Sequence, residues 1–370
     1  MTFKTRTQLA LRAARAHSSD KSALVGLDGF VDTIVTPVAQ RTAQGEEFTP
    51  IHNIPEFAQR IAGAAGKSTN IEFYPRMEKL GGNGPIMANA LLAAGTHVTY
   101  VGALGRPSLH SVFHDFACHA EVVSLCDPAT TIAVELDDGK IMLGQLRSLD
   151  SITLDTIELV MGADKFRATL ATSDLVALVN WTMIPNMTSI LAALADEVLP
   201  ALPPHEGRTF FFDLADPEKR SAADILEVLA IMTRFEAFGA VTLGLNLKEA
   251  QRVYDVLGFA ARGETETDLR AIAADIREKL ALATVVVHPR ESAACATAAG
   301  TFWVPGPYMD KPLITTGAGD HFNAGFAQGQ LLGLDPEACL GLGVCTSGHY
   351  VRTAVSPSLD DLDQFLSTWE

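Results

Sequence analysis

The most informative stretch of this 370-residue sequence runs Thr315-Thr316-Gly317-Ala318-Gly319-Asp320-His321-Phe322-Asn323-Ala324-Gly325-Phe326. Apolar and glycine residues recur at helical spacing up to Leu332, which predicts a helix that begins at the glycines and ends near Gly333. Unpaired N–H groups at a helix start favour anions, and missing side chains let a phosphate approach the backbone. The stretch therefore predicts an anion-binding turn with Asp320 just inside it.

Two interpretations of Asp320 are open at this point. A carboxylate in the first turn complements the helix dipole, which contributes about 0.3 to 1 kcal/mol. Alternatively, a carboxylate beside a phosphate-binding turn accepts the proton of a substrate hydroxyl that attacks a phosphoryl group. The P-loop pattern G-x-x-x-x-G-K-[ST] does not occur, and Phe322 stands where G-x-G-x-x-G needs its third glycine.

Elsewhere, short β-branched runs alternate with helical stretches, which predicts an α/β fold with a mostly parallel sheet. Segments near 32–40, 70–80 and 130–147 do not fit this alternation, and the last is predicted to be a hairpin around Asp137-Asp138-Gly139. We expect these segments to form a small sheet beside the core, within a single domain over 1–370. The predicted core strands are 23–27, 97–101, 175–180, 209–213, 240–243 and 284–287, and the predicted helices are 85–94, 189–198, 221–235, 247–257 and 267–280.

Composition and net charge argue against some classes of binding partner. Hydrophobic residues make up 48% and charged residues 19% of the chain, which is typical of folded proteins. A net charge of −16 repels nucleic-acid phosphates and anionic lipids, and no run of 18 apolar residues occurs, so we expect neither a nucleic-acid nor a membrane partner. The five cysteines lack C-x-x-C spacing, which favours reduced thiols and a cytoplasmic location. The basic segment from Lys4 to Lys21 is interpreted as an amphipathic helix, with a transit peptide as the alternative.

The Gly-Ala-Gly-Asp core resembles the C-terminal signature of the PfkB/ribokinase family of carbohydrate kinases, Asp-Thr-x-Gly-Ala-Gly-Asp followed by a helix. The resemblance implies a ribokinase-like three-layer α/β/α core with a mostly parallel sheet and a small β-sheet lid. It also implies that Asp320 is the catalytic base. The amides of Gly317, Ala318 and Gly319 would form an anion hole for the transferred phosphoryl group.

A second match is Asn246-Leu247-Lys248-Glu249, which fits the Asn-x-x-Glu motif of the family. The resemblance implies that Glu249 helps to hold magnesium, mainly through water, and that Asn246 lies near the phosphates of the nucleotide. Asn246 is equally suited to cap the helix that contains Glu249. Asp213 follows another predicted strand and either helps to organise magnesium or stabilises a loop.

The third match, Gly81-Gly82-Asn83-Gly84-Pro85, resembles the N-terminal Gly-Gly signature of the family. The resemblance implies that Gly82 and Asn83 contact sugar hydroxyls. A glycine turn before a helix would explain the same residues. Ile86 stands where family members commonly carry asparagine.

The fourth match is the first predicted strand and the acids that follow it, from Gly26 to Asp32. In the family an aspartate just past this strand binds two sugar hydroxyls, a role suited to the several acceptor sites of a carboxylate. The resemblance places that role on Asp32, although the spacing from Gly26 is one residue longer than usual. Asp28 could serve instead, or both acids could be turn residues.

Two departures concern the nucleotide side. Ile314 stands where the signature usually has aspartate, so a support for the turn is missing or replaced. The segment from His288 to Ser292 stands where the family usually shows a Thr-x-Gly nucleotide loop. Arg290 either contacts phosphate or points to solvent. The nucleotide-binding residues implied by the resemblance are Asn246, His288, Arg290, Thr316 and Gly319.

We therefore expect a carbohydrate kinase that uses ATP and magnesium to phosphorylate a hydroxyl of a sugar or polyol, with Asp320 as the base. A monovalent cation is a further candidate cofactor, and the resemblance implies a homodimer through the lid. One alternative is a nucleoside kinase of the same family. The other is a catalytically inactive sensor of a sugar or nucleotide. The sequence does not identify the sugar, the hydroxyl or the preferred nucleotide.

Overall fold

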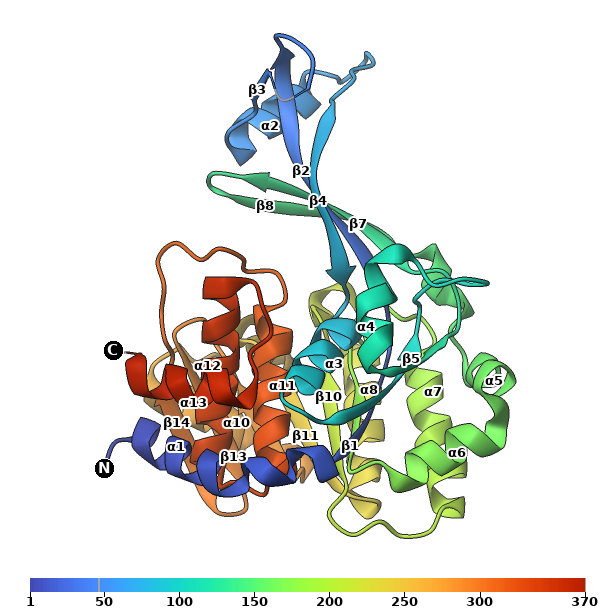
Figure 1. Ribbon diagram of the computed structural model, residues 1–370, viewed down its shortest axis with the longest axis vertical. Helices are drawn as coiled ribbons and strands as arrows, with labels where there is room; N and C mark the ends of the chain where they lie inside the picture. Colours follow the sequence, from blue (N-terminus) through green and yellow to red (C-terminus); the bar gives the residue numbers. More distant parts are fainter. Residues whose placement is uncertain (46, 370) are drawn as a thin grey trace.

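The computed structural model describes residues 1–45 and 47–369, and its largest feature is a nine-stranded sheet built from these residues (Figure 1). The strands lie in the order β14-β13-β12-β11-β10-β9-β1-β5-β6. From β12 to β6 the strands pair in parallel, and β13 and β14 add an antiparallel edge. In chain order the strands are β1 (Ser22–Leu27), β5 (His97–Gly102), β6 (Glu121–Ser124), β9 (Leu175–Leu178), β10 (Thr209–Asp213), β11 (Ala240–Leu245), β12 (Thr284–Val287), β13 (Ser292–Thr297) and β14 (Gly300–Pro305).

Every core strand predicted from the sequence lies in this sheet, which confirms the α/β fold with a mostly parallel sheet. Central strands are continuous apolar runs because helices cover both of their faces. In β10, for example, Phe210, Phe211 and Phe212 are fully buried. The strands that the sequence did not predict are β6, β13 and β14 at the two edges of the sheet. Alanines in β13 have low strand propensity, so the pattern there is weak.

Helices on both faces complete a three-layer α/β/α core, and each face has its own hydrophobic cluster. One face carries α5 (Leu154–Ile157), α6 (Ala163–Thr172), α7 (Met187–Ala193), α8 (Ala222–Arg234), α9 (Leu247–Val256) and α10 (Glu266–Leu280). The other face carries α1 (Phe3–Ala14), α3 (Asn83–Ala93), α4 (His114–His119), α11 (Ala318–Leu331), α12 (Pro336–Thr353) and α13 (Leu359–Thr368). The five predicted helices correspond to α3, α7, α8, α9 and α10.

The basic N-terminal segment forms helix α1, which packs against the C-terminal helices (Figure 1). Arg12 Nε donates to Asp363 Oδ1 at 2.8 Å, and Arg6 Nε donates to Glu337 Oε2 at 2.7 Å. Leu11 of the same helix is fully buried. These contacts support the amphipathic-helix interpretation. Among the residues that the structure describes, no helix is long and apolar enough to cross a membrane.

A smaller sheet, which we call the lid, extends away from the core (Figure 1). Its strands are β2 (Phe30–Arg41), β3 (Phe48–Pro50), β4 (Phe73–Gly81), β7 (Ala129–Leu136) and β8 (Gly139–Gln145). The central strand β2 pairs with β4 and β3 in antiparallel fashion and with β7 in parallel. The hairpin predicted around Asp137-Asp138-Gly139 is formed by β7 and β8. Helix α2 (Ile54–Ala62), between β3 and β4, was not predicted.

Candidate active site

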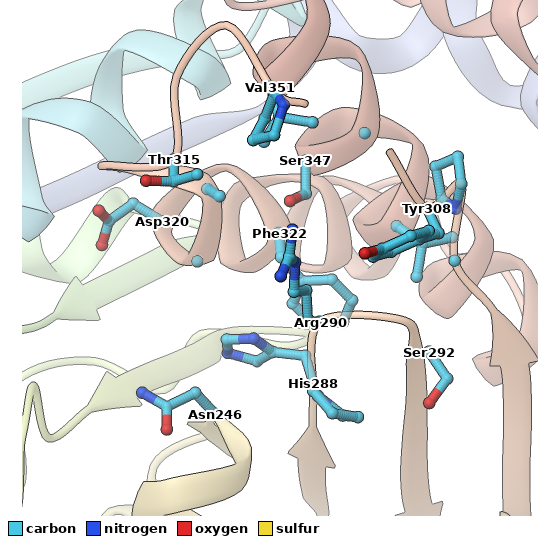
Figure 2. A pocket seen from close by; sticks show the side chains of 18 of the residues that line it. Asn246, His288, Arg290, Ser292, Tyr308, Thr315, Asp320, Phe322, Ser347 and Val351 are labelled. Carbon is cyan, nitrogen blue, oxygen red and sulfur yellow. The ribbon is translucent and has the colours of Figure 1, made fainter. Parts of the chain in front are cut away.

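Asp320 lies in the first turn of α11, at the edge of a cavity of about 460 Å³ (Figure 2). The helix begins after Gly317, whose φ of 94° is in the left-handed region that glycine adopts without strain. Asn83 Nδ2 donates to Asp320 Oδ1 at 2.8 Å. The other carboxylate oxygen, Oδ2, has no donor among the described residues. Asp320 therefore combines a fixed orientation with one oxygen available to a ligand.

Burial raises the pKa of Asp320 well above its usual value. The negative charges of Asp28 and Glu249 raise this pKa further, whereas the Asn83 hydrogen bond and the Lys79 ammonium lower it. The protein therefore makes Asp320 a stronger proton acceptor than an exposed aspartate. Its ionisation depends on the groups that oppose the effect of burial.

Asp28 anchors the glycine turn that carries Asn83. Its carboxylate accepts the backbone N–H groups of Asn83 at 2.9 Å and Gly84 at 2.8 Å, and the Asn180 side-chain amide at 2.6 Å. Burial raises its pKa to about 6 despite these hydrogen bonds. A side chain at Gly84 would overlap the Tyr100 hydroxyl, since an added Cβ would lie 2.5 Å from that oxygen. Asp28 is fully buried and engaged by protein donors, so its visible role is to hold the turn and aim Asn83 at Asp320.

Asp32 lies on the lid strand β2, where only 4% of its surface is exposed. In the lid register it is opposite Lys79 on β4 and Thr131 on β7. Burial raises the pKa of Asp32, while Lys79 and the Thr131 hydroxyl lower it. Lys79 is half-buried; burial lowers its pKa, and Asp32 and Asp320 raise it. The lid therefore places the Lys79 ammonium beside Asp32 and within electrostatic reach of Asp320.

Three side chains donate hydrogen bonds to the turn that precedes Asp320. Lys140 Nζ, on β8 of the lid, donates to the hydroxyl of Thr316 and, at 3.2 Å, to that of Thr315. Tyr350 OH donates to the Thr316 carbonyl oxygen at 3.0 Å. His321 Nδ1–H donates to the Gly317 carbonyl oxygen at 2.7 Å. These side chains support the turn where Ile314 replaces the usual aspartate of the signature.

The ring of His321 is neutral, because burial lowers its pKa to about 4. Its Nε2 therefore accepts a hydrogen bond, from the Ser356 hydroxyl at 2.9 Å. Within the predicted anion hole, the Ala318 N–H donates to the Thr315 carbonyl oxygen at 3.2 Å. The N–H groups of Gly317 and Gly319 have no acceptor among the described residues, so these two are free to bind an anion.

Two further carboxylates lie on the core side of Asp320. Asn246 and Glu249 form a capping box at the start of α9, which confirms the N-cap interpretation of Asn246. Glu249 is 5% exposed, and its oxygens accept the N–H groups of Asn246 and Asp216, both at 2.9 Å. Asp213 at the end of β10 accepts a hydrogen bond from Asn323 Nδ2 at 2.7 Å. Burial and the charge of Glu249 raise the pKa of Asp213 well above its usual value.

These carboxylates suit a magnesium ion better than a softer metal. Within residues 1–45 and 47–369, no group of three or more His, Cys, Asp and Glu side chains is arranged to hold a metal ion. Mg²⁺ retains several waters and takes only one or two carboxylates, so it does not need such a group. The mutual repulsion of Asp213 and Glu249, which raises the pKa of Asp213, would be relieved by a divalent cation. The donor set of Asp213 and Glu249 therefore fits magnesium bound mainly through water.

The far end of the cavity is formed by the segment after β12 and the segment after β14. His288 stacks on Phe322 with 4.5 Å between ring centroids, and its buried Nε2 has no partner in the described part of the chain. Burial lowers the pKa of His288 to about 4. Arg290 is exposed and lies over the Tyr308 ring, 5.1 Å from its centroid. Figure 2 shows Asp320 at one end of this cavity and Tyr308 at the other, with Arg290 between them.

Comparison with known proteins places the chain in a family. Residues 4–369 match the family model described as prokaryotic ketohexokinase. The chain belongs to this family. Members of the ketohexokinase family are carbohydrate kinases, and this chain is therefore a carbohydrate kinase that transfers a phosphoryl group to a sugar. A curated relative, the ketohexokinase of Haloferax volcanii, is 28% identical over 348 residues, which cover 93% of this chain and 90% of the relative.

Solved structures show the same fold as this ketohexokinase-family chain at low sequence identity. A putative ribokinase II from E. coli has a TM-score of 0.65 and 14% identity, and the match covers 94% of this chain and 99% of the other. Arabidopsis thaliana ribokinase, solved with ribose and ATP, has a TM-score of 0.62 and 16% identity, with 94% and 98% covered. These similarities confirm the ribokinase-like fold expected from the Gly-Ala-Gly-Asp signature.

The structure of this ketohexokinase-family chain brings the predicted residues of the turns and the nucleotide side together, and it adds two lysines. Lys79 and Lys140 carried no sequence signal, because their place in the site follows from strand register. Trp181, which follows β9, is fully buried with its Nε1 donating to Thr188 at 2.8 Å, as expected of a core residue. The predicted residues that line the cavity are Asn83, Asp213, Asn246, Glu249, His288, Arg290, Ala318, Gly319 and Asp320. The predicted residues that do not line it are Asp28, Asp32, Gly82, Thr316 and Gly317.

Proposed function

We propose that this carbohydrate kinase transfers the γ-phosphoryl group of ATP to a hydroxyl of a ketohexose, with Asp320 as the base. The observation that carries the proposal concerns the start of α11, where Asp320 Oδ2 and the N–H groups of Gly317 and Gly319 have no hydrogen-bond partner among the described residues. A hydroxyl at Oδ2 would lose its proton to a carboxylate whose pKa is raised by burial. The N–H groups of Gly317 and Gly319 and the helix dipole would stabilise charge on the transferred phosphoryl group.

The acceptor sugar would lie between Asp320 and the lid. Asp32 supplies carboxylate oxygens that suit two sugar hydroxyls, and Lys79 supplies a cation beside them. Asn83 is held by Asp28 and keeps Asp320 oriented, so a sugar beside Gly82 would meet both groups. We prefer Asp32 to Asp28 for the sugar contact because the Asp28 carboxylate is already engaged by protein donors.

ATP would occupy the cavity, with its phosphates near α11 and its base toward Tyr308. The volume of about 460 Å³ is in the range typical of small-molecule sites. His288 Nε2, which has no partner within residues 1–45 and 47–369, and the guanidinium of Arg290 are polar groups that a nucleotide could engage. Asn246 and Thr316 complete the proposed nucleotide contacts. Magnesium held by Asp213 and Glu249 through water would neutralise phosphate charge.

The family of the chain favours a sugar over a nucleoside as the acceptor, since the family model and the relative in Haloferax volcanii are both ketohexokinases. The nucleoside-kinase structures that resemble this chain share only its fold, at 15% and 18% identity. A cytoplasmic location and homodimerisation through the lid stay predictions.

The test is an assay that couples ADP release to a visible signal, with ATP and magnesium and a panel of acceptors. Ketohexoses such as fructose are compared with aldohexoses, pentoses, polyols and nucleosides. We expect ADP release that depends on a ketohexose. Release that occurs only with a nucleoside would support the alternative kinase. If no acceptor in the panel causes ADP release but a titration still shows ATP binding, the result would support a catalytically inactive sensor.

A further inference from the structure

One part of the lid, formed by β3 and α2, contacts the tip of the β7–β8 hairpin, and this hairpin in turn contacts the active site. We call residues 47–62, which contain β3 and α2, the brace segment. Ile51 and Phe57 of this segment are buried, and the Phe57 ring lies 6.2 Å from that of Phe73 on β4. Ile51 N–H donates to the Pro37 carbonyl oxygen at 2.8 Å. The brace segment is therefore packed and hydrogen-bonded onto the lid sheet.

The start of α2 and the residues just before it are hydrogen-bonded to the tip of the β7–β8 hairpin. Ile54 N–H donates to Asp138 Oδ1 at 2.9 Å, and Asp137 N–H donates to the His52 carbonyl oxygen at 2.8 Å. The His52 ring pairs with the Asp137 carboxylate at 3.1 Å. A carboxylate at the start of a helix also interacts favourably with the helix dipole. The hairpin tip thus contacts the brace segment through the backbone and side chain of Asp137 and through the side chain of Asp138.

Lys140 follows this tip directly and connects it to the phosphoryl-transfer turn. Its ammonium donates to the hydroxyls of Thr315 and Thr316, which precede the glycines of the proposed anion hole. The contact joins residues that are 175 and 176 positions apart in the chain. The ammonium is the only lid group that hydrogen-bonds this turn within the described residues. A shift of the hairpin would therefore be transmitted to the turn through one side chain.

We propose that Lys140 is a positioning residue for phosphoryl transfer and that the brace segment, through Asp138, sets its place. The inference rests on the proposed function, because the turn is taken to be the anion hole. Phosphoryl transfer depends mainly on positioning, and an error of about 1 Å can cost about a hundredfold in rate. The contacts predict that loss of either Asp138 or Lys140 lowers kcat while changing KM little.

The kinetic test is a double-mutant cycle in the full chain. Lys140→Met should lower ketohexose-dependent kcat about tenfold or more, and Lys140→Arg should restore much of it. Asp138→Ala should lower kcat about threefold to tenfold, whereas Asp138→Asn keeps an acceptor oxygen and should stay near the unmodified rate. In the Lys140→Met background, Asp138→Ala should have almost no further effect, because both act through the same contact.

The matched control is Glu78→Ala, which removes an exposed acid from β4 of the same lid. This variant should keep kcat within twofold of the unmodified chain. Equal losses from Asp138→Ala in both backgrounds would overturn the brace, and a Lys140→Met kcat within twofold of the unmodified value would overturn the role of Lys140. Thermal unfolding midpoints identify any variant whose loss of rate is a loss of folded protein.

A second measurement separates this inference from the proposed function. Amide hydrogen exchange of residues 313–319 can be followed whether or not the chain phosphorylates a ketohexose. Lys140→Met and Asp138→Ala should each speed exchange in this turn, and Glu78→Ala should not. Unchanged exchange in both variants would overturn the inference, even in a fully active enzyme. Absence of ketohexose-dependent ADP release in the unmodified chain would instead overturn the proposed function.

Discussion

The core and the lid place opposite charges around Asp320. On the core side, burial and the carboxylates Asp28 and Glu249 raise its pKa. On the lid side, Lys79 lowers that pKa, and Lys140 hydrogen-bonds the turn before it. The Asn83 hydrogen bond from core helix α3 opposes this rise in pKa, and Lys79 of the lid adds to that opposition. The lid is therefore part of the electrostatics of the proposed base, Asp320.

The largest expected effect comes from removing the negative charge of Asp320. Asp320→Asn keeps the shape of the side chain but cannot accept the proton of the acceptor hydroxyl. We expect kcat to fall by about 10² to 10⁴, the usual contribution of general base catalysis. Sugar and nucleotide binding should persist, which ligand-dependent shifts in the thermal unfolding midpoint can measure. An Asp320→Asn variant that keeps more than about a tenth of the rate would rule out this assignment of the base.

A smaller effect is expected from a substitution on the core side of Asp320, at Glu249. Glu249→Gln removes one of the two carboxylates proposed to hold magnesium. The amide oxygen can accept only one of the two backbone N–H groups that the carboxylate accepts, so the thermal unfolding midpoint is measured to identify any loss of folded protein. We expect the magnesium concentration for half-maximal rate to rise about tenfold, in line with the loss of a metal-orienting group. The measurement is a magnesium titration of the initial rate at saturating ATP and sugar.

The control for this prediction is Glu218→Gln, an exposed acid whose partner is Lys248, which should leave the titration unchanged. If Glu249→Gln lowers the rate equally at every magnesium concentration, Glu249 does not bind the ion and acts only as the helix cap seen in the capping box.

The core side of this site could be predicted from the sequence because its signals are local. A glycine turn before a helix, as at Gly317, and an N-cap followed by an acid three residues later, as at Asn246 and Glu249, are encoded within a few residues. The ambiguity between Asp28 and Asp32 could not be resolved locally. It depends on which acid receives the N–H groups of a turn more than 50 residues away.

The lid sheet and its hairpin were predicted, but the lysines that the lid brings to the site could not be, because their positions depend on strand register. Lys79 lies opposite Asp32 only through the β2–β4 pairing, whose register shifts between Ile34 and Val35. Lys140 looks like an ordinary exposed lysine after a hairpin turn until Thr315 and Thr316 are placed beside it. Helix α2 was missed as well, although Asn53 and Pro55 are good residues for a helix start.

The smallest expected effect tests the lid side directly, through the pH dependence of the rate. Asp320 must be ionised to accept a proton, so kcat/KM should fall on the acidic side of the profile. The positive charge of Lys79 lowers the pKa of Asp320, and its removal in Lys79→Met should raise that pKa. The acid limb should therefore move to higher pH. Lys79→Arg keeps the charge and should leave the limb in place. A limb that moves to lower pH in Lys79→Met, or that moves equally in both variants, would show that the lid does not tune the base and that its charges serve only the sugar.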